Sequence, residues 1–192
     1  MSQDPPTTLP TTGYALLGLL TFGDELTGYE LKQRADNTLR FYWVAPAMSQ
    51  IYSELGRLTV HGFVEPTTST GNGRRTTTYR ITELGREALH VWLAEAPIGF
   101  PVLKHTVLLR LLIGHATEPA RITAMLEDYV AQLAAALDDL REVRESLRGG
   151  DAPGEIFHYP SVVADWGLDY FAAETRHTRT ALDRLSAHSE DA

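Results

Sequence analysis

The sequence predicts a mainly α-helical protein made of two parts. Apolar residues recur with helical periodicity over most of its 192 residues, which indicates amphipathic helices. Two β-prone runs flank a glycine-rich turn within residues 63–82, which indicates one hairpin in the first half. Prolines and a glycine at residues 97–101 then break the chain, and we place the boundary there. We therefore expect a flexible arm of residues 1–12 and domains spanning residues 13–97 and 101–188.

Composition narrows the class of protein. The chain has no cysteine, which excludes disulfides and thiolate metal sites and suits a cytoplasmic protein. Its formal net charge is -8, divided as -2 over residues 1–97 (8 Lys/Arg, 10 Asp/Glu) and -6 over residues 98–192 (9 Lys/Arg, 15 Asp/Glu). Any contact with nucleic acid must therefore depend on a local basic patch. We expect no membrane partner, because no apolar run approaches the roughly 18 residues of a membrane span and the first residues lack a signal-peptide pattern.

The first part is expected to begin with two helices. Residues 14–22 are rich in leucine and alanine, which favours a buried helix. Thr27, followed three residues later by Glu30, has the form of a capping box and predicts the start of the second helix. Pro46 suits the first turn of a third helix, and Gly62 suits a left-handed cap at its end.

The third helix is amphipathic, and the hairpin follows it at once. Its apolar residues recur at spacings of 4 and 3 and predict one stripe that faces the core: Ile51, Leu55 and Leu58. The residues away from that stripe are polar: Ser49, Gln50, Ser53 and Arg57. The hairpin carries Arg74 and Arg75 beside its glycine-rich turn, and residues 83–96 then form a fourth helix.

This order of elements predicts a winged helix-turn-helix of three helices and a two-stranded wing. Such a domain lays one helix in the DNA major groove and its hairpin beside it. Glutamine pairs with adenine, arginine with guanine or phosphate, and serine with either, so the polar face of the third helix suits double-stranded DNA. We expect Arg74 and Arg75 to meet the DNA backbone or the adjacent minor groove. The acidic total charge keeps one alternative open, a winged helix that docks a protein.

Three segments closely resemble PadR-type transcriptional regulators: ALLGLLTFGDELTGYELKQ, FYWVAPAMSQIYSELGRLTVHGFVE and GRRTTTYRITELGREALHVWL. They cover most of residues 14–93, and the second half more loosely resembles the helical dimerisation domain of longer-tailed members. The resemblance implies a homodimeric repressor on a pseudo-palindromic operator, often responding to a small aromatic or lipophilic effector. It places Tyr52 in the recognition helix and Tyr14 against a phosphate. Many members have a proline after that recognition-helix tyrosine, where this chain has Ser53.

The second part is expected to be an all-helical dimerisation domain. Apolar residues follow a heptad pattern from Ile122 to Leu147, and the last helix covers about residues 161–187. We expect the interface between two copies to comprise the following residues: Leu126, Tyr129, Leu133, Leu140, Trp166 and Tyr170. An aromatic effector pocket between the two parts is the functional alternative for Trp43, Trp166 and Tyr170. Packing in the core is the simpler interpretation of Trp43.

No catalytic, cofactor or metal site is expected. The sequence lacks the nucleophile elbow GxSxG, the zinc motif HExxH, a glycine-rich phosphate loop and a cysteine nucleophile. Its seven histidines form no HxxxH or HxH pair, which argues against a metal site. The sequence therefore predicts a protein that is not an enzyme.

Overall fold

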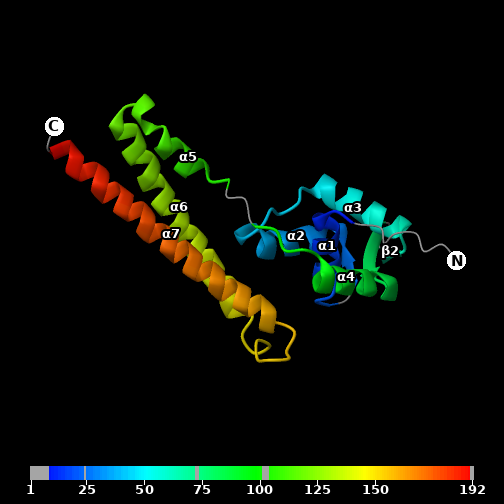
Figure 1. The fold of residues 1–192 in the computed structure, drawn as a ribbon. Helices are drawn as coiled ribbons and strands as arrows, with labels where there is room; N and C mark the ends of the chain where they lie inside the picture. Colours follow the sequence, from blue (N-terminus) through cyan, green and yellow to red (C-terminus); the bar gives the residue numbers. More distant parts are fainter. Residues whose placement is uncertain (1–8, 24, 72–73, 101–103, 191–192) are drawn as a thin grey trace. The chain divides into compact units, whose positions relative to one another are not determined.

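The computed structural model describes residues 9–23, 25–71, 74–100 and 104–190, and the chain divides into two compact units, residues 1–99 and 100–192 (Figure 1). The first unit contains α1 (Thr11–Leu20), β1 (Leu26–Thr27), α2 (Gly28–Thr38), η1 (Leu39–Phe41), α3 (Met48–Val60), β2 (Val64–Gly71), β3 (Arg74–Ile81) and α4 (Glu83–Glu95). The second contains α5 (Thr106–Leu112), η2 (Gly114–Ala116), α6 (Pro119–Ser146) and α7 (His158–Glu190). The expected fold class is confirmed: a winged helix-turn-helix precedes a helical region.

The first helix begins earlier than the sequence predicts. Helix α1 starts at Thr11, within the stretch expected to be a flexible arm, and Leu9 is already buried. Burial of an apolar side chain in the core holds the backbone beside it, so the expectation of an arm extending to residue 12 is wrong at its end. Residues 1–8 of that arm lie outside the described residues.

The core of the first unit joins its helices and sheet. Leu16, Leu17 and Leu20 of α1 are fully buried with Leu31 of α2. The expected stripe of α3 is confirmed, because Ile51, Leu55 and Leu58 are fully buried in the same cluster.

The expected helix boundaries also hold at α2 and α3. The Thr27 hydroxyl accepts from the Glu30 N–H at 3.1 Å, and Glu30 Oε2 accepts from the Thr27 N–H at 2.8 Å, which completes the capping box. Gly62 has a φ of 71°, as a left-handed cap at the end of α3 requires. Both sequence signals therefore mark the helix ends that they predict.

The sheet has a third strand that the sequence does not reveal. Its order is β1-β3-β2, and both pairs are antiparallel. The wing is the hairpin β2–β3, in register from Val64 opposite Ile81 to Gly71 opposite Arg74. Strand β1 has two residues, too few to show an alternating pattern, and it pairs Leu26 with Tyr79. This pairing ties the start of α2 to the wing.

The heptad seam of the second unit is internal to one chain. Helices α6 and α7 lie side by side along most of their length (Figure 1). Leu126, Leu133 and Leu140 are almost fully buried within the unit. On α7, small residues are the buried ones: Ser161, Ala164 and Thr178. The prediction that Leu126, Leu133 and Leu140 contact a second copy is therefore wrong, because their apolar surface is already covered.

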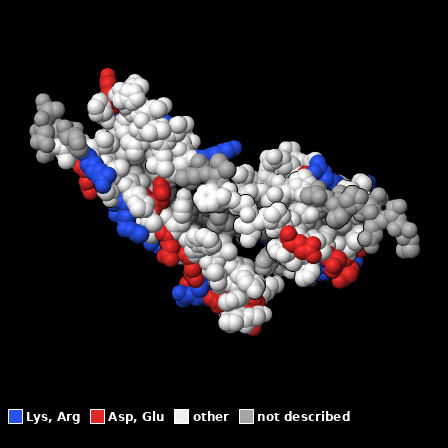
Figure 2. Space-filling view, in the orientation of Figure 1, with Lys and Arg blue, Asp and Glu red and all other residues white. Residues whose placement is uncertain are grey.

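Surface charge is mixed in the second unit. Figure 2 shows acidic and basic side chains interspersed along its helices on the visible face. Arg144 links two of the acidic groups to α6, donating to Asp151 at 2.9 Å and to Asp165 at 2.8 Å. These bonds, with Asp165 first, raise the pKa of the Arg144 guanidinium. In the described part of the chain, no helix combines the length and the apolar character that membrane crossing requires.

Candidate nucleic-acid interface

The outward face of α3 is polar at its centre. Ser49, Tyr52 and Ser53 are exposed, while the buried residues of the helix face the core. Arg57, one turn further along, is also exposed. The structure therefore brings four of the predicted DNA-binding residues onto one helical face, as periodicity requires.

Gln50 has a second role that sequence patterning did not indicate. Its Oε1 accepts from the Ala47 N–H at 2.9 Å, which satisfies a backbone donor at the start of α3. Bidentate pairing with adenine requires that same amide oxygen as an acceptor. In the free protein, Gln50 therefore stabilises the beginning of α3, and its amide nitrogen is the group left to face outward.

Arg57 is paired loosely with a buried carboxylate. Its Nη1 lies 3.5 Å from Glu54 Oε1, one turn back on α3. The Glu54 residue is 9% exposed, and its Oε2 makes no hydrogen bond with a described atom. This oxygen faces Gly13, 3.4 Å from where a Cβ there would stand, in the first turn of α1. A carboxylate beside a helix N-terminus is electrostatically favourable, so Glu54 helps to hold α3 against α1.

The wing presents Arg75 on a defined face. Both arginines of the pair lie in strand β3 and not in the turn itself. Because side chains alternate along a strand, Arg75 shares a face with Tyr79 and Ile81. Arg75 is exposed and forms no ion pair with any described residue. Arg74 opens the strand opposite Gly71, and its side chain lies outside the described residues.

Other basic side chains of the first unit are engaged within it. Arg80, on the opposite face of β3 from Arg75, pairs with Glu65 of β2 at 2.7 Å. Lys32 pairs with Asp36, and Arg34 donates to the Leu19 carbonyl at 3.1 Å. Such pairing leaves Arg75 better placed than these residues to neutralise a phosphate.

Tyr14 has a packing role instead of the predicted phosphate contact. The residue is 8% exposed, and its ring stacks on Trp92 of α4 with centroids 4.7 Å apart. Stacking and burial leave little of this side chain for a ligand. The expected phosphate contact of Tyr14 is therefore not supported by its position.

Comparisons with known proteins follow the same division of the chain. The model of the transcriptional regulator PadR-like family matches residues 16–91, and the model described as virulence activator alpha C-term matches residues 103–186. The negative transcriptional regulator PadR of Bacillus subtilis (strain 168) is 31% identical over 141 residues, which cover 73% of this chain and 76% of that protein. The chain belongs to the PadR-like family of transcriptional regulators.

Solved structures of this PadR-like family share the fold. Bacillus subtilis PadR in complex with operator DNA is similar with a TM-score of 0.79 and 25% identity, over 92% of this chain and 99% of that one. The same protein in complex with p-coumaric acid gives a TM-score of 0.72 and 24% identity over the same shares. The family resemblance and the expectation of a regulator that is not an enzyme are thus confirmed.

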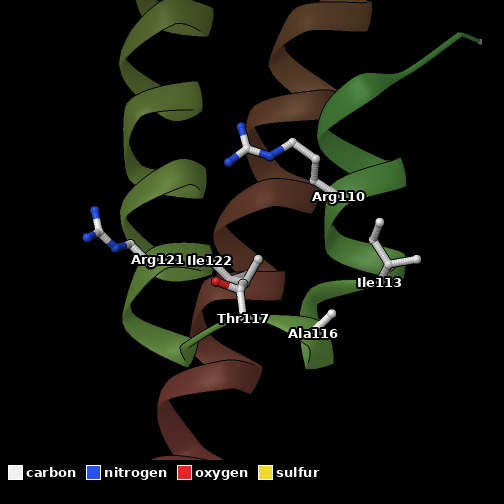
Figure 3. Close-up of a pocket in the computed structure, with 6 residues that line it drawn as sticks. All are labelled: Arg110, Ile113, Ala116, Thr117, Arg121 and Ile122. Carbon is white, nitrogen blue, oxygen red and sulfur yellow. The ribbon is translucent and has the colours of Figure 1, made fainter.

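The aromatic residues predicted for an effector pocket in this PadR-like protein are exposed. Trp43 is 38% exposed and lies outside the core cluster, so the prediction that it packs in the core is wrong. Trp166 is 75% exposed and Tyr170 46% exposed on α7. None of the three lines the cavity of about 370 Å³ shown in Figure 3. That cavity is lined by Arg110, Ile113, Ala116, Thr117, Arg121 and Ile122; Arg110 extends toward α6, whereas Arg121 points away from α5.

Tyr129 belongs to a hydrogen-bonded cluster within the second unit. Its hydroxyl lies 3.1 Å from His105 Nε2 and donates to Glu174 Oε1 at 3.3 Å, while His105 Nε2 lies 2.8 Å from the same oxygen. Burial, and then the Glu174 carboxylate, raise the pKa of Tyr129 to about 12. His105 Nδ1 accepts from the Leu108 N–H at 3.2 Å and caps α5. The interface role predicted for Tyr129 is therefore replaced by a role in joining α5, α6 and α7.

No metal site is visible in the described residues. Among them, no three His, Asp or Glu side chains converge in a way that could hold an ion. The His105 cluster combines one imidazole, one carboxylate and one phenol that already bond to each other. Its chemistry is therefore structural.

Proposed function

We propose that this protein is a cytoplasmic repressor that binds a pseudo-palindromic operator as a homodimer and blocks transcription sterically. One observation carries the proposal: α3 exposes Ser49, Tyr52 and Ser53 on one face, and Arg75 lies unpaired, among the described residues, on the wing that follows. Operator binding by the related Bacillus subtilis PadR supports it. The protein-docking alternative lacks such support.

The proposed contacts divide by chemistry. Ser49, Ser53 and the amide nitrogen of Gln50 face base edges, and Tyr52 presents its phenol beside them. Arg57 and Arg75 face phosphates, which fix the register of α3 on the duplex. We keep Arg74 as a proposed phosphate contact and omit Tyr14.

The proposed dimer surface is the exposed apolar stripe of α7. Tyr159, Val163, Trp166 and Tyr170 recur at spacings of 4, 3 and 4, so they share one face of the helix. Tyr159 is 78% exposed and Trp166 75% exposed in the single chain. An apolar stripe of this kind in a monomer is typical of a surface that a partner covers. A second copy is the occupant that a two-fold symmetric operator requires.

We further propose that a small aromatic or lipophilic effector releases the operator. The structure of a relative with p-coumaric acid supports an aromatic acid as the first compound to test. Addition of p-coumaric acid should change tryptophan fluorescence and weaken operator binding. If neither quantity changes across a broad panel of aromatic acids and esters, the effector proposal is rejected while the DNA-binding proposal stands.

Selection of genomic fragments on the purified protein tests the central proposal. The recovered fragments should share two half-sites about one helical turn, roughly 34 Å, apart or a multiple of it. Fluorescence anisotropy should then show at least about 10³-fold tighter binding to the recovered duplex than to a random duplex of equal length. Fragments without a shared sequence, bound no better than random DNA, would favour the protein-docking alternative.

A further inference from the structure

The ring of Tyr52 occupies the space where residue 28 would carry a side chain. A Cβ placed on Gly28 would lie 2.6 Å from Tyr52 Cε1 and 2.8 Å from Cζ, both far inside van der Waals contact. The ring of the recognition helix thus lies directly on the first turn of α2. Only glycine allows so close an approach between a ring and a backbone.

A second element borders the same ring. Tyr79 of β3 has its pKa raised by burial and then by the nearby Tyr52 phenol, so the two hydroxyl groups lie close together. Strand β1, which ends just before Gly28, pairs with β3 at Tyr79. Tyr52 nevertheless remains 52% exposed. One side of its ring is therefore held by α2 and β3, and the other side is open.

We propose that Gly28 positions Tyr52 for its contact with DNA. This inference rests on the proposed function. A side chain at position 28 would force the Tyr52 ring out of its place and into another rotamer, which moves the phenol by several ångströms. A ring held in place before binding also loses less conformational entropy when DNA arrives. Gly28 thus acts through Tyr52 and touches no DNA itself.

Four variants test this coupling: Gly28→Ala, Tyr52→Ala, their combination, and Gly18→Ala as the control. Gly18 lies in a helix too, but a Cβ there would meet nothing within 4 Å. The probe is a labelled duplex recovered from genomic selection, with a random duplex of equal length for comparison. Tyr52→Ala and Gly28→Ala should each lower affinity for the recovered duplex by about three- to tenfold. The combination should bind as Tyr52→Ala does, and Gly18→Ala as the unaltered protein does.

Each other outcome overturns a specific step. Full affinity in Gly28→Ala, or multiplied losses in the combination, would mean that Gly28 does not act through Tyr52. Full affinity in Tyr52→Ala would remove the DNA contact itself, with the proposed function intact. If Gly28→Ala alone fails to fold by circular dichroism, the combination decides, since removing the ring removes the clash. A combination that still fails to fold shows that α2 itself requires glycine, whereas loss of all sequence-specific binding by the unaltered protein defeats the proposed function first.

Discussion

The carbonyl oxygen of Phe63 lies 2.2 Å from the position that a Cβ of Gly85 would occupy. Helix α4 therefore approaches the start of the wing more closely than any side chain at position 85 permits. Thr82 completes the junction, since its N–H donates to the Phe63 carbonyl at 3.1 Å and its hydroxyl accepts from the Gly85 N–H at 3.1 Å.

Gly85→Ala should reverse the usual effect of this substitution. Alanine in place of glycine within a helix ordinarily stabilises by about 1 kcal/mol. Here the clash with a backbone atom should lower the free energy of unfolding by about 1–3 kcal/mol. Urea unfolding measures it, with Gly18→Ala, which has open space, as the control that should gain stability. An unchanged midpoint for Gly85→Ala would show that α4 can shift away freely.

Gln50→Ala should weaken the protein as well as its DNA complex. Loss of the hydrogen bond to the Ala47 N–H should lower the free energy of unfolding by about 0.3–1.5 kcal/mol. Gln50→Glu retains an acceptor for that bond and should keep most of the stability. Chemical unfolding of both variants, beside anisotropy on the recovered and random duplexes, separates the two roles. Equal stability of Gln50→Ala and the unaltered protein would rule out the capping role.

Arg75→Ala should flatten the salt dependence of DNA binding. A dimer would lose up to about two phosphate contacts, and each lowers the log–log slope by about 0.9. Arg80→Ala is the matched control, because it removes the same charge from the same strand but Arg80 pairs with Glu65. Anisotropy across a salt series should show a smaller slope for Arg75→Ala alone. If both variants give the same slope, Arg75 has no direct contact with phosphate.

Trp166→Asp and Leu133→Asp should fail in different ways. Trp166 is exposed on α7, so an aspartate there should leave a folded monomer by light scattering and circular dichroism. Leu133 is 4% exposed inside the α6–α7 pair, so an aspartate there buries a lone charge and should unfold the second unit. A Trp166→Asp protein of unchanged dimer mass would reject the α7 stripe as the interface.

Tyr129 should titrate late. Its pKa of about 12 lies above the value of about 10 for a free phenol, because burial and Glu174 disfavour the phenolate. The folded state therefore holds this proton more tightly than the unfolded state, and the resulting stability is full below pH ~10 and lost between about pH 10 and 12. Tyrosinate absorbance should show one phenol ionising in that range, absent in Tyr129→Phe. Identical titration curves for the two proteins would contradict the raised pKa.

Local patterns in the sequence were sufficient for the first unit. Capping at Thr27, the turn at Gly62 and the stripe of Ile51, Leu55 and Leu58 depend on neighbours within one turn of chain, so periodicity and turn chemistry predict them. The order of helices and hairpin then predicts the winged helix. The polar face of α3 follows, because positions away from a buried stripe must face outward.

Contacts between distant residues were decided by the tertiary structure alone. A heptad pattern indicates that Leu126, Leu133 and Leu140 share a buried seam, but the same pattern fits a partner from another chain or from the same one. The structure buries the seam within the unit because α7 folds back along α6. Likewise, no spacing in the sequence places Gly28 under Tyr52 or Phe63 against Gly85, since each pair is brought together by the packing of separate elements. Burial and close approach are properties of the assembled fold, and local sequence carries only the need for a small residue there.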